Sequence, residues 1–215
     1  MKTIPLRFVK TRRKYGYWRE LLEQWLFLVE RLPRMTKNED AVYSYKERTN
    51  AGLLAAAAVA NGWMALEECR TDKNSSDESD DEVYQGRSDI RIWRDARHHE
   101  IEAKFLRVAF ASESTQRLTK TAIKALEDSS RSVPSGDKFD RKIAVTFVVP
   151  TMTVAQLSKT TDAEMEEYRS KLIKQILSMH PSFIAYTFPG AVKAVGSPNR
   201  RALGVILFGS EPKET

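Results

Sequence analysis

The chain of 215 residues is poor in the residues that build disulfide frameworks and zinc clusters, with one cysteine and three histidines. The single cysteine, Cys69, excludes a structural disulfide and any Cys-x-x-Cys metal site, which favours a reducing compartment and a cytoplasmic protein. The first ten residues contain no apolar segment of the secretory type, so we expect no signal peptide. The longest uncharged stretch, 49–66, contains Asn50 and Asn61, so we expect a buried helix and strand and no membrane span.

Sequence motifs of several large enzyme classes are also absent. The chain has no G-x-x-x-x-G-K-[ST], no G-x-S-x-G, no H-E-x-x-H and no G-x-G-x-x-G. NTPase, α/β-hydrolase, zincin and dinucleotide-dependent functions therefore have no support. His98 and His99 are adjacent but have no third histidine nearby, so we expect them in a turn and not in a metal site.

The charge is unevenly distributed. Lys and Arg number 35 and Asp and Glu 29, a net charge of +6. Residues 1–34 hold nine Lys and Arg against three Glu, whereas residues 71–82 hold six acids and one Lys. The acidic segment lacks the glycine and final glutamate of an EF-hand loop, so we do not expect it to bind Ca²⁺. Its charged, serine-rich composition predicts a mobile loop. The basic segment indicates a polyanionic partner, and a solvated surface that only aids solubility is the alternative.

Hydrophobic periodicity predicts helices in three places. Apolar residues spaced by three and four over Tyr17–Leu32 predict an amphipathic helix that ends at Pro33 and packs on the core. Its aromatic content leaves a homodimer interface as the alternative. A second helix is expected over Tyr43–Ala60, and the capping box of Thr161 and Glu164 begins a later helix.

Strands are expected between and after these helices. Apolar runs predict strands at 63–70, 88–94, 100–108, 142–149, 183–188 and 202–209, with a further helix at 112–128. This order indicates an α/β domain with a mixed sheet flanked by helices and an extra amphipathic helix at the N-terminus. The expected segments are a basic arm with that helix (1–40), a core (41–150) and a C-terminal part that completes the same domain (151–215).

Three charged residues fall on one predicted hairpin. Asp89 begins the first strand, while Glu102 and Lys104 lie two residues apart on one face of the second. If the strands pair, the three side chains converge, with the backbone carbonyl of Ala103 beside them. Carboxylate and carbonyl oxygens suit Mg²⁺ or Mn²⁺, and a nearby lysine can orient an attacking water or stabilise negative charge. Glu100 shares this face but has no lysine two residues later.

This Asp-x12-Glu-x-Lys arrangement resembles the PD-(D/E)xK nuclease superfamily, which has the restriction-endonuclease-like fold. The resemblance covers residues 43–150 and includes the order helix, three strands, helix and strand. In that family the first helix often supplies an acid, and Glu47 stands at the matching place, with Glu67 and Glu68 as alternatives. Ser88 stands where the family often has proline.

The resemblance implies a metal-dependent nuclease of phage or prokaryotic type that hydrolyses phosphodiester bonds, with DNA favoured as substrate. The residues that it assigns to catalysis are Asp89, Glu102, Lys104 and Glu47. Those that would hold Mg²⁺ or Mn²⁺ are Asp89, Glu102 and the carbonyl of Ala103. The residues expected to contact nucleic-acid phosphates are Arg12, Arg13, Lys14, Gln116 and Lys120.

Plainer interpretations of the same residues stay open. Asp89 would then cap a turn after Gly86, and Glu102 and Lys104 would form a surface pair worth less than ~1 kcal/mol. The acid-x-Lys pattern alone carries little information, since it recurs at 211–213. The second hypothesis for the function is a catalytically inactive nuclease-like domain that binds nucleic acid or assembles with a partner.

Overall fold

The computed structural model describes four stretches of the chain, 4–74, 83–110, 115–130 and 140–212, and for 71–74, 83–85, 115–116 and 140 it describes the backbone alone. The helices are η1 (Arg13–Tyr15), α1 (Trp18–Met35), η2 (Val42–Ser44), α2 (Glu47–Ala60), α3 (Thr115–Ser130), α4 (Val154–Leu157) and α5 (Asp162–Ser178). The strands are β1 (Arg7–Thr11), β2 (Met64–Asn74), β3 (Val83–Arg94), β4 (Arg97–Ala109), β5 (Asp140–Thr153), β6 (Phe183–Thr187), β7 (Val192–Ala194), β8 (Ser197–Ala202) and β9 (Val205–Ser210).

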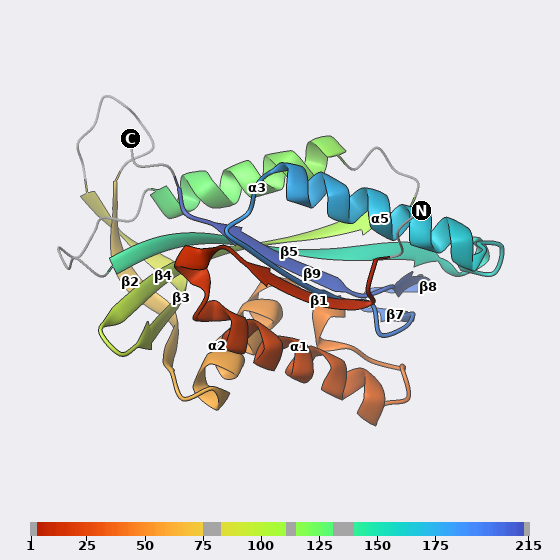
Figure 1. Ribbon diagram of the computed structural model, residues 1–215, viewed down its shortest axis with the longest axis horizontal. Helices are drawn as coiled ribbons and strands as arrows, with labels where there is room; N and C mark the ends of the chain where they lie inside the picture. Colours follow the sequence, from red (N-terminus) through yellow and green to blue (C-terminus); the bar gives the residue numbers. More distant parts are fainter. Residues whose placement is uncertain (1–3, 75–82, 111–114, 131–139, 213–215) are drawn as a thin grey trace.

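The described strands form one mixed sheet in the order β1-β6-β9-β5-β4-β3-β2, and β8 pairs with both β5 and β7. β4 and β5 are parallel, and the other paired strands are antiparallel. Figure 1 shows α1 and α2 on one face of the sheet and α3 and α5 on the other. The expected α/β class, with helices flanking a mixed sheet, is therefore confirmed.

A hydrophobic core fills each side of the sheet. On the side of α1 and α2, the side chains of Trp18, Trp25 and Phe147 are completely buried. On the other side, Leu118 of α3 and Ile176 of α5 are completely buried as well. Burial of one such side chain contributes about 1.5–3 kcal/mol. Trp18 and Trp25 of α1 thus pack inside the fold, whereas Phe27 of the same helix is exposed.

α1 continues to Met35 and does not end at Pro33, so the predicted end was wrong. A proline has no backbone N–H, so α1 lacks the hydrogen bond that residue 33 would donate to the carbonyl of Val29. The N–H of Thr36 still donates to the carbonyl of Leu32 at 2.9 Å. The ring of Pro33 is buried and adds to the core.

α2 begins at Glu47, four residues later than predicted. Tyr43 belongs to η2, and Lys46 has extended backbone dihedrals that separate the two helices. Glu47 therefore lies in the first turn of α2, where a carboxylate interacts favourably with the helix dipole. The helix ends at Asn61 and Gly62 as predicted, and Gly62 has a φ of +80°.

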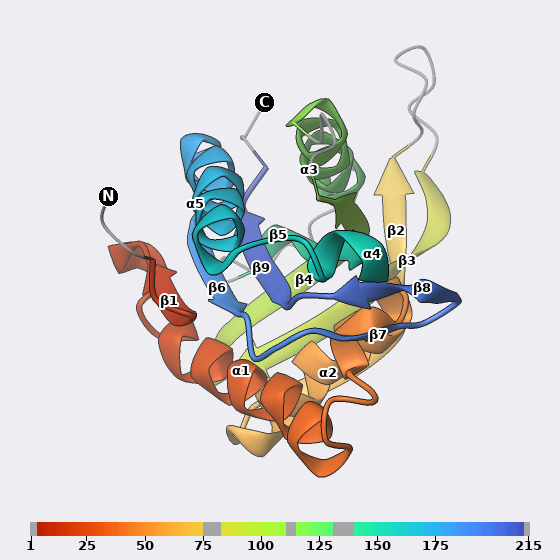
Figure 2. The same cartoon turned by 90° about the vertical axis from the view of Figure 1, so that its right-hand side faces the viewer.

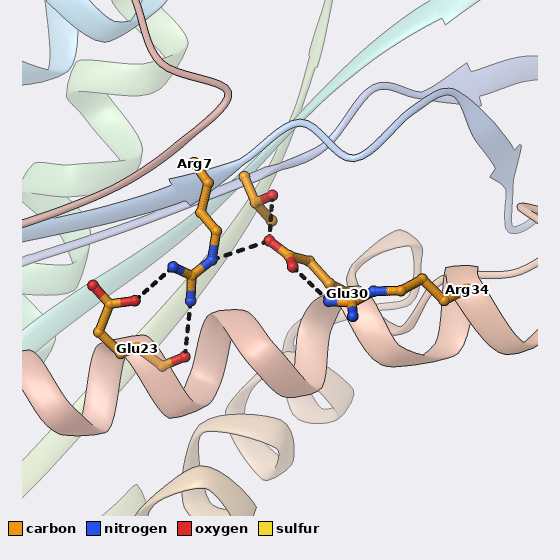
Figure 3. Close-up of polar contacts among 5 residues, drawn as sticks. Arg7, Glu23, Glu30 and Arg34 are labelled. Atoms are coloured by element: carbon orange, nitrogen blue, oxygen red, sulfur yellow. Dashed lines mark hydrogen bonds and ion pairs between the residues drawn. The ribbon is translucent and has the colours of Figure 1, made fainter.

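The basic N-terminal segment is not a free arm, because β1 pairs with β6 at the edge of the sheet. Arg7 contacts Glu23 at 2.7 Å and Glu30 at 3.3 Å, both in α1 (Figure 3). Glu30 also accepts hydrogen bonds from Arg34 and Thr187 at 2.7 and 2.8 Å. One carboxylate therefore connects β1, α1 and β6. β1 escaped prediction, as did the short β7 and β8.

β3 and β4 form the predicted hairpin, and it is tighter than expected. Arg94 pairs with Arg97, which leaves a two-residue turn that begins at Asp95 with a φ of +53°. His98 and His99 therefore lie in β4, so their predicted position in the turn was wrong. β2 extends into the segment predicted as an acidic loop, and the rest of that loop, 75–82, lies outside the described residues.

Candidate functional site

The candidate site lies where β3 and β4 separate. The pairing that begins at the hairpin turn ends at Ile90 and Ile101, and no later pair joins the two strands over the described residues. The next opposed residues would be Asp89 and Glu102. β4 continues beside β5 as far as Ala109. From Glu102 onward, the edge of β4 that faces away from β5 therefore has no strand paired with it among the described residues.

Two carboxylates lie along this edge of β4. Asp89 Oδ2 accepts the backbone N–H of Ala103 at 2.7 Å. Two residues further along, a backbone hydrogen bond from Phe105 reaches Glu47 of α2 and lowers the pKa of that carboxyl against the effect of its burial. Alternate residues of a strand direct their N–H and C=O groups to the same edge, so the carbonyl of Ala103 lies on this edge as well. The site thus combines side-chain and backbone oxygens.

Lys104 and Glu102 lie on the face of β4 that α3 covers. Ala103, between them, is buried in the opposite core, and Glu102 is itself only 4% exposed. Lys104 Nζ contacts Asp128 Oδ2 of α3 at 2.9 Å, and both side chains are about one-fifth exposed. The lysine is therefore held between the sheet and α3.

The charges of this site act on one another. Burial raises the pKa of Glu47 and the charges of Asp89 and Asp128 raise it further, whereas Lys104 opposes this effect. Burial alone would lower the pKa of Lys104, but its hydrogen bond to Asp128 and the charges of Asp128, Glu47 and Asp89 raise it above the ordinary value. Three acids from α2, β3 and α3 thus surround one ammonium group.

The other candidates for the third acid lie elsewhere. Glu67 is exposed, and its carboxylate lies against Gly52 of α2. Glu68 forms ion pairs with Arg48 and Arg87. Glu100 is buried and lies 3.8 Å from Arg91. Burial raises the pKa of Glu47, and the charges of Lys104 and Asp89 act on that pKa in opposite directions.

Metal binding by side chains alone has no three-residue candidate here. Within the described ranges, no three His, Cys, Asp or Glu side chains are grouped so that they could hold an ion. The ligand set expected from the sequence has two carboxylates, Asp89 and Glu102, and the carbonyl of Ala103. The structure places Asp89 Oδ2 2.7 Å from the backbone N of Ala103, the residue that follows Glu102, where the pairing of β3 with β4 ends.

Residues expected to contact nucleic acid are spread over two elements. Arg12 donates to the carbonyl of His180 at 2.6 Å, and Lys14 forms an ion pair with Glu211. Arg13 is exposed in η1, and Lys120 is exposed on α3. The side chain expected at position 116, that of Gln116, lies outside the described part of the chain.

Asp128 is the one member of the charged cluster that sequence reasoning missed. It lies three residues after the buried Ala125 on α3, a spacing that returns to the same helix face. An acid in the last turn of a helix is also unfavourable beside the helix dipole. These two signals together could have marked Asp128 as a residue with a partner on the sheet face that α3 covers.

The two adjacent histidines have packing roles. His99 is completely buried, its ring lies 5.7 Å from that of Tyr17 and 5.5 Å from that of Trp18, and its Nε2 lies 3.0 Å from the hydroxyl of Tyr17. Burial lowers the pKa of His99 to about 3, so its ring is neutral. His98 stacks on Trp93 with the ring centroids 4.8 Å apart.

Comparison with known proteins adds no relative. No protein-family model, no curated protein and no solved structure matches the chain. None of the helices described here is long and apolar enough to cross a membrane.

Proposed function

We propose that the chain is a metal-dependent nuclease of PD-(D/E)xK type, with a restriction-endonuclease-like core, that hydrolyses phosphodiester bonds in nucleic acid, with DNA as the favoured substrate. The observation that carries this proposal is the hydrogen bond of 2.7 Å from Ala103 to Asp89 at the separation of β3 and β4. It supports a common location for Asp89, Glu102 and the Ala103 carbonyl, with Lys104 alongside.

The residues fit a hard divalent cation. Asp89 and Glu102 offer carboxylate oxygens and Ala103 a carbonyl oxygen, which are the donors that Mg²⁺ and Mn²⁺ prefer, and water completes their coordination. Glu47 adds negative charge from α2. Such an ion lowers the pKa of water and offsets charge on a phosphate.

Besides a bound metal ion, Lys104 contributes a positive charge to the site. Its ammonium group can orient a water molecule or stabilise the charge that develops on phosphate oxygens in the transition state. The contact of 2.9 Å with Asp128 fixes the position of Nζ. Asp128 is accordingly a positioning residue, because it acts through Lys104.

The test is cleavage of plasmid, linear and branched DNA and of RNA, with Mg²⁺ or Mn²⁺ and with EDTA. We expect metal-dependent cleavage by the wild-type chain and a loss of about 100-fold or more in Lys104→Ala. Lys171→Ala is the matched control, because Lys171 is an exposed lysine of α5 that pairs with Glu167 at 2.7 Å. Equal rates for wild type and Lys104→Ala would reject the assigned site.

The second candidate is a nuclease-like domain that binds nucleic acid without cutting it. The observation that favours it is the ion pair of Lys104 with Asp128, because the carboxylate competes with water or phosphate for the ammonium group. Calorimetric titration with Mn²⁺ separates the two candidates. A Mn²⁺ site that disappears in Asp89→Ala supports the nuclease, and the absence of such a site supports the binding domain.

A further inference from the structure

Two exposed arginines converge on one glutamate beside the candidate site. Arg48 Nε lies 3.4 Å from Glu68 Oε1, and an Nη of Arg87 lies 3.1 Å from Glu68 Oε2. The arginine side chains are 80% and 69% exposed, and that of Glu68 is 39% exposed. Arg48 directly follows Glu47 in the first turn of α2, and Arg87 precedes Asp89 by two residues on β3. The arginine pair therefore comes from the same helix and strand as Glu47 and Asp89, within two residues of each in the sequence.

The backbone of β2 is irregular at this point. Glu67 pairs with Ile90 and Cys69 with Ser88, but the position between them, where Glu68 would pair with Asp89, is missing from the ladder. Glu68 has a φ of +50°, in the left-handed region that non-glycine residues seldom adopt. Such outliers gather at functional sites, where surrounding contacts maintain them. At this irregular point the carboxylate of Glu68 contacts Arg48 and Arg87.

The cluster of Arg48, Arg87 and Glu68 contains two positive charges and one negative charge. Two guanidinium groups share one carboxylate, so the cluster keeps a net positive charge. Exposed ion pairs contribute little to stability and exchange readily with other partners. A guanidinium group presents parallel N–H donors that match the oxygens of a phosphate, and two such groups held together match it better than one. Glu68 thus keeps the arginines together without neutralising them.

We propose that Arg48 and Arg87 form a binding site for a backbone phosphate of the nucleic-acid strand, next to the bond that is cut. This inference rests on the proposed nuclease function and specifies how the substrate is held there. The site contacts phosphate and no base edge, so it supplies affinity without sequence preference. α2, β2 and β3, which carry the three residues, are neighbours in the fold (Figure 2).

The test measures binding without catalysis. Fluorescence anisotropy of labelled double-stranded and single-stranded DNA and RNA is recorded in EDTA at salt concentrations from about 50 to 200 mM. The variant is Arg48→Gln with Arg87→Gln. The control is Lys171→Gln with Lys193→Gln, which removes the same charge from two exposed lysines that also pair with glutamates.

The arginine variant should bind about tenfold more weakly, and its slope of log K against log salt concentration should fall by about one unit. The control should change both quantities much less. A further variant, Arg48→Lys with Arg87→Lys, keeps the charge and loses the paired donors, so it should retain the slope at intermediate affinity.

Each contrary outcome identifies what has failed. If the wild-type chain binds no nucleic acid, both the proposed function and the phosphate site are rejected. If wild type binds and the arginine variant binds equally well, the phosphate site is rejected while the nuclease proposal stands. If the control loses as much affinity as the arginine variant, the effect is one of net charge and the phosphate site is again rejected.

Discussion

Asp89 accepts the backbone N–H of Ala103 at 2.7 Å, so a side chain of β3 takes over from the backbone of β3 as the hydrogen-bonding partner of β4. This exchange keeps the β4 edge satisfied while the two strands separate, and it brings a carboxylate to a backbone carbonyl. The same point of the fold carries Glu102 and Lys104.

Metal binding should stabilise the fold. At a free Mn²⁺ concentration of 100 times the dissociation constant, binding to the native state alone adds about 2.7 kcal/mol. For a chain of this size that raises Tm by about 5–10 °C, which thermal unfolding followed by circular dichroism would detect. Glu102→Gln should abolish the shift. Glu100→Gln is the matched control on the same strand face and should retain it, and the reverse pattern would make Glu100 the ligand.

Asp128→Asn should lower kcat by about 10–100-fold with little change in KM, as expected for a residue that orients a catalytic group. Asp128→Glu, which restores the charge, should recover part of the activity. Steady-state cleavage kinetics provide both constants. Glu127→Gln, an exposed neighbour on α3, should behave as wild type. A change in KM alone would show that Asp128 affects binding and not the position of Lys104.

His99 should make the protein sensitive to acid. Its pKa is about 3 in the folded chain, against 6.5 for an ordinary histidine, so the unfolded state binds a proton that the folded state excludes. Stability from this group is complete above pH 6.5 and is lost as the pH falls toward 3. By pH 5 the loss is about 1.5 kcal/mol relative to pH 6.5. Urea unfolding of His99→Phe should show a smaller loss than wild type, and identical pH profiles would contradict this account.

Glu30→Gln should destabilise the fold by about 1–3 kcal/mol, because the carboxylate is 15% exposed and bonded by Arg7, Arg34 and Thr187. Glu23→Gln is the control. Glu23 pairs with the same Arg7, but its side chain is 41% exposed, so its loss should cost less than about 1 kcal/mol. Chemical denaturation would measure both, and equal effects would argue against a special role for Glu30.

Local patterns predicted much of the fold. The alternation of Ile90 and Ile92 located β3, and the capping box of Thr161 and Glu164 located the start of α5. β1 escaped because Val9 is its one buried residue, and an edge strand with so little burial has no clear alternation. β7 and β8 are short or polar, so their pairing depends on neighbours that are distant in the sequence.

In the candidate site, too, some residues follow from local sequence patterns and others depend on distant parts of the chain. The spacing of Glu102 and Lys104 on one strand face follows from alternation, and Asp89 follows from the hairpin. The placement of Glu47 needed the family resemblance, because it comes from another element. Local signals could have marked Asp128 as a residue with a partner, but that the partner is Lys104 depends on how α3 packs on the sheet.

The central claim is that the separation of β3 and β4 forms the metal centre of a nuclease. Anomalous diffraction from crystals soaked in Mn²⁺ tests it most directly. We predict one strong peak at about 2.0–2.2 Å from oxygens of Asp89, Glu102 and the carbonyl of Ala103. A peak at other residues, or none while these three groups stay in place, would contradict it.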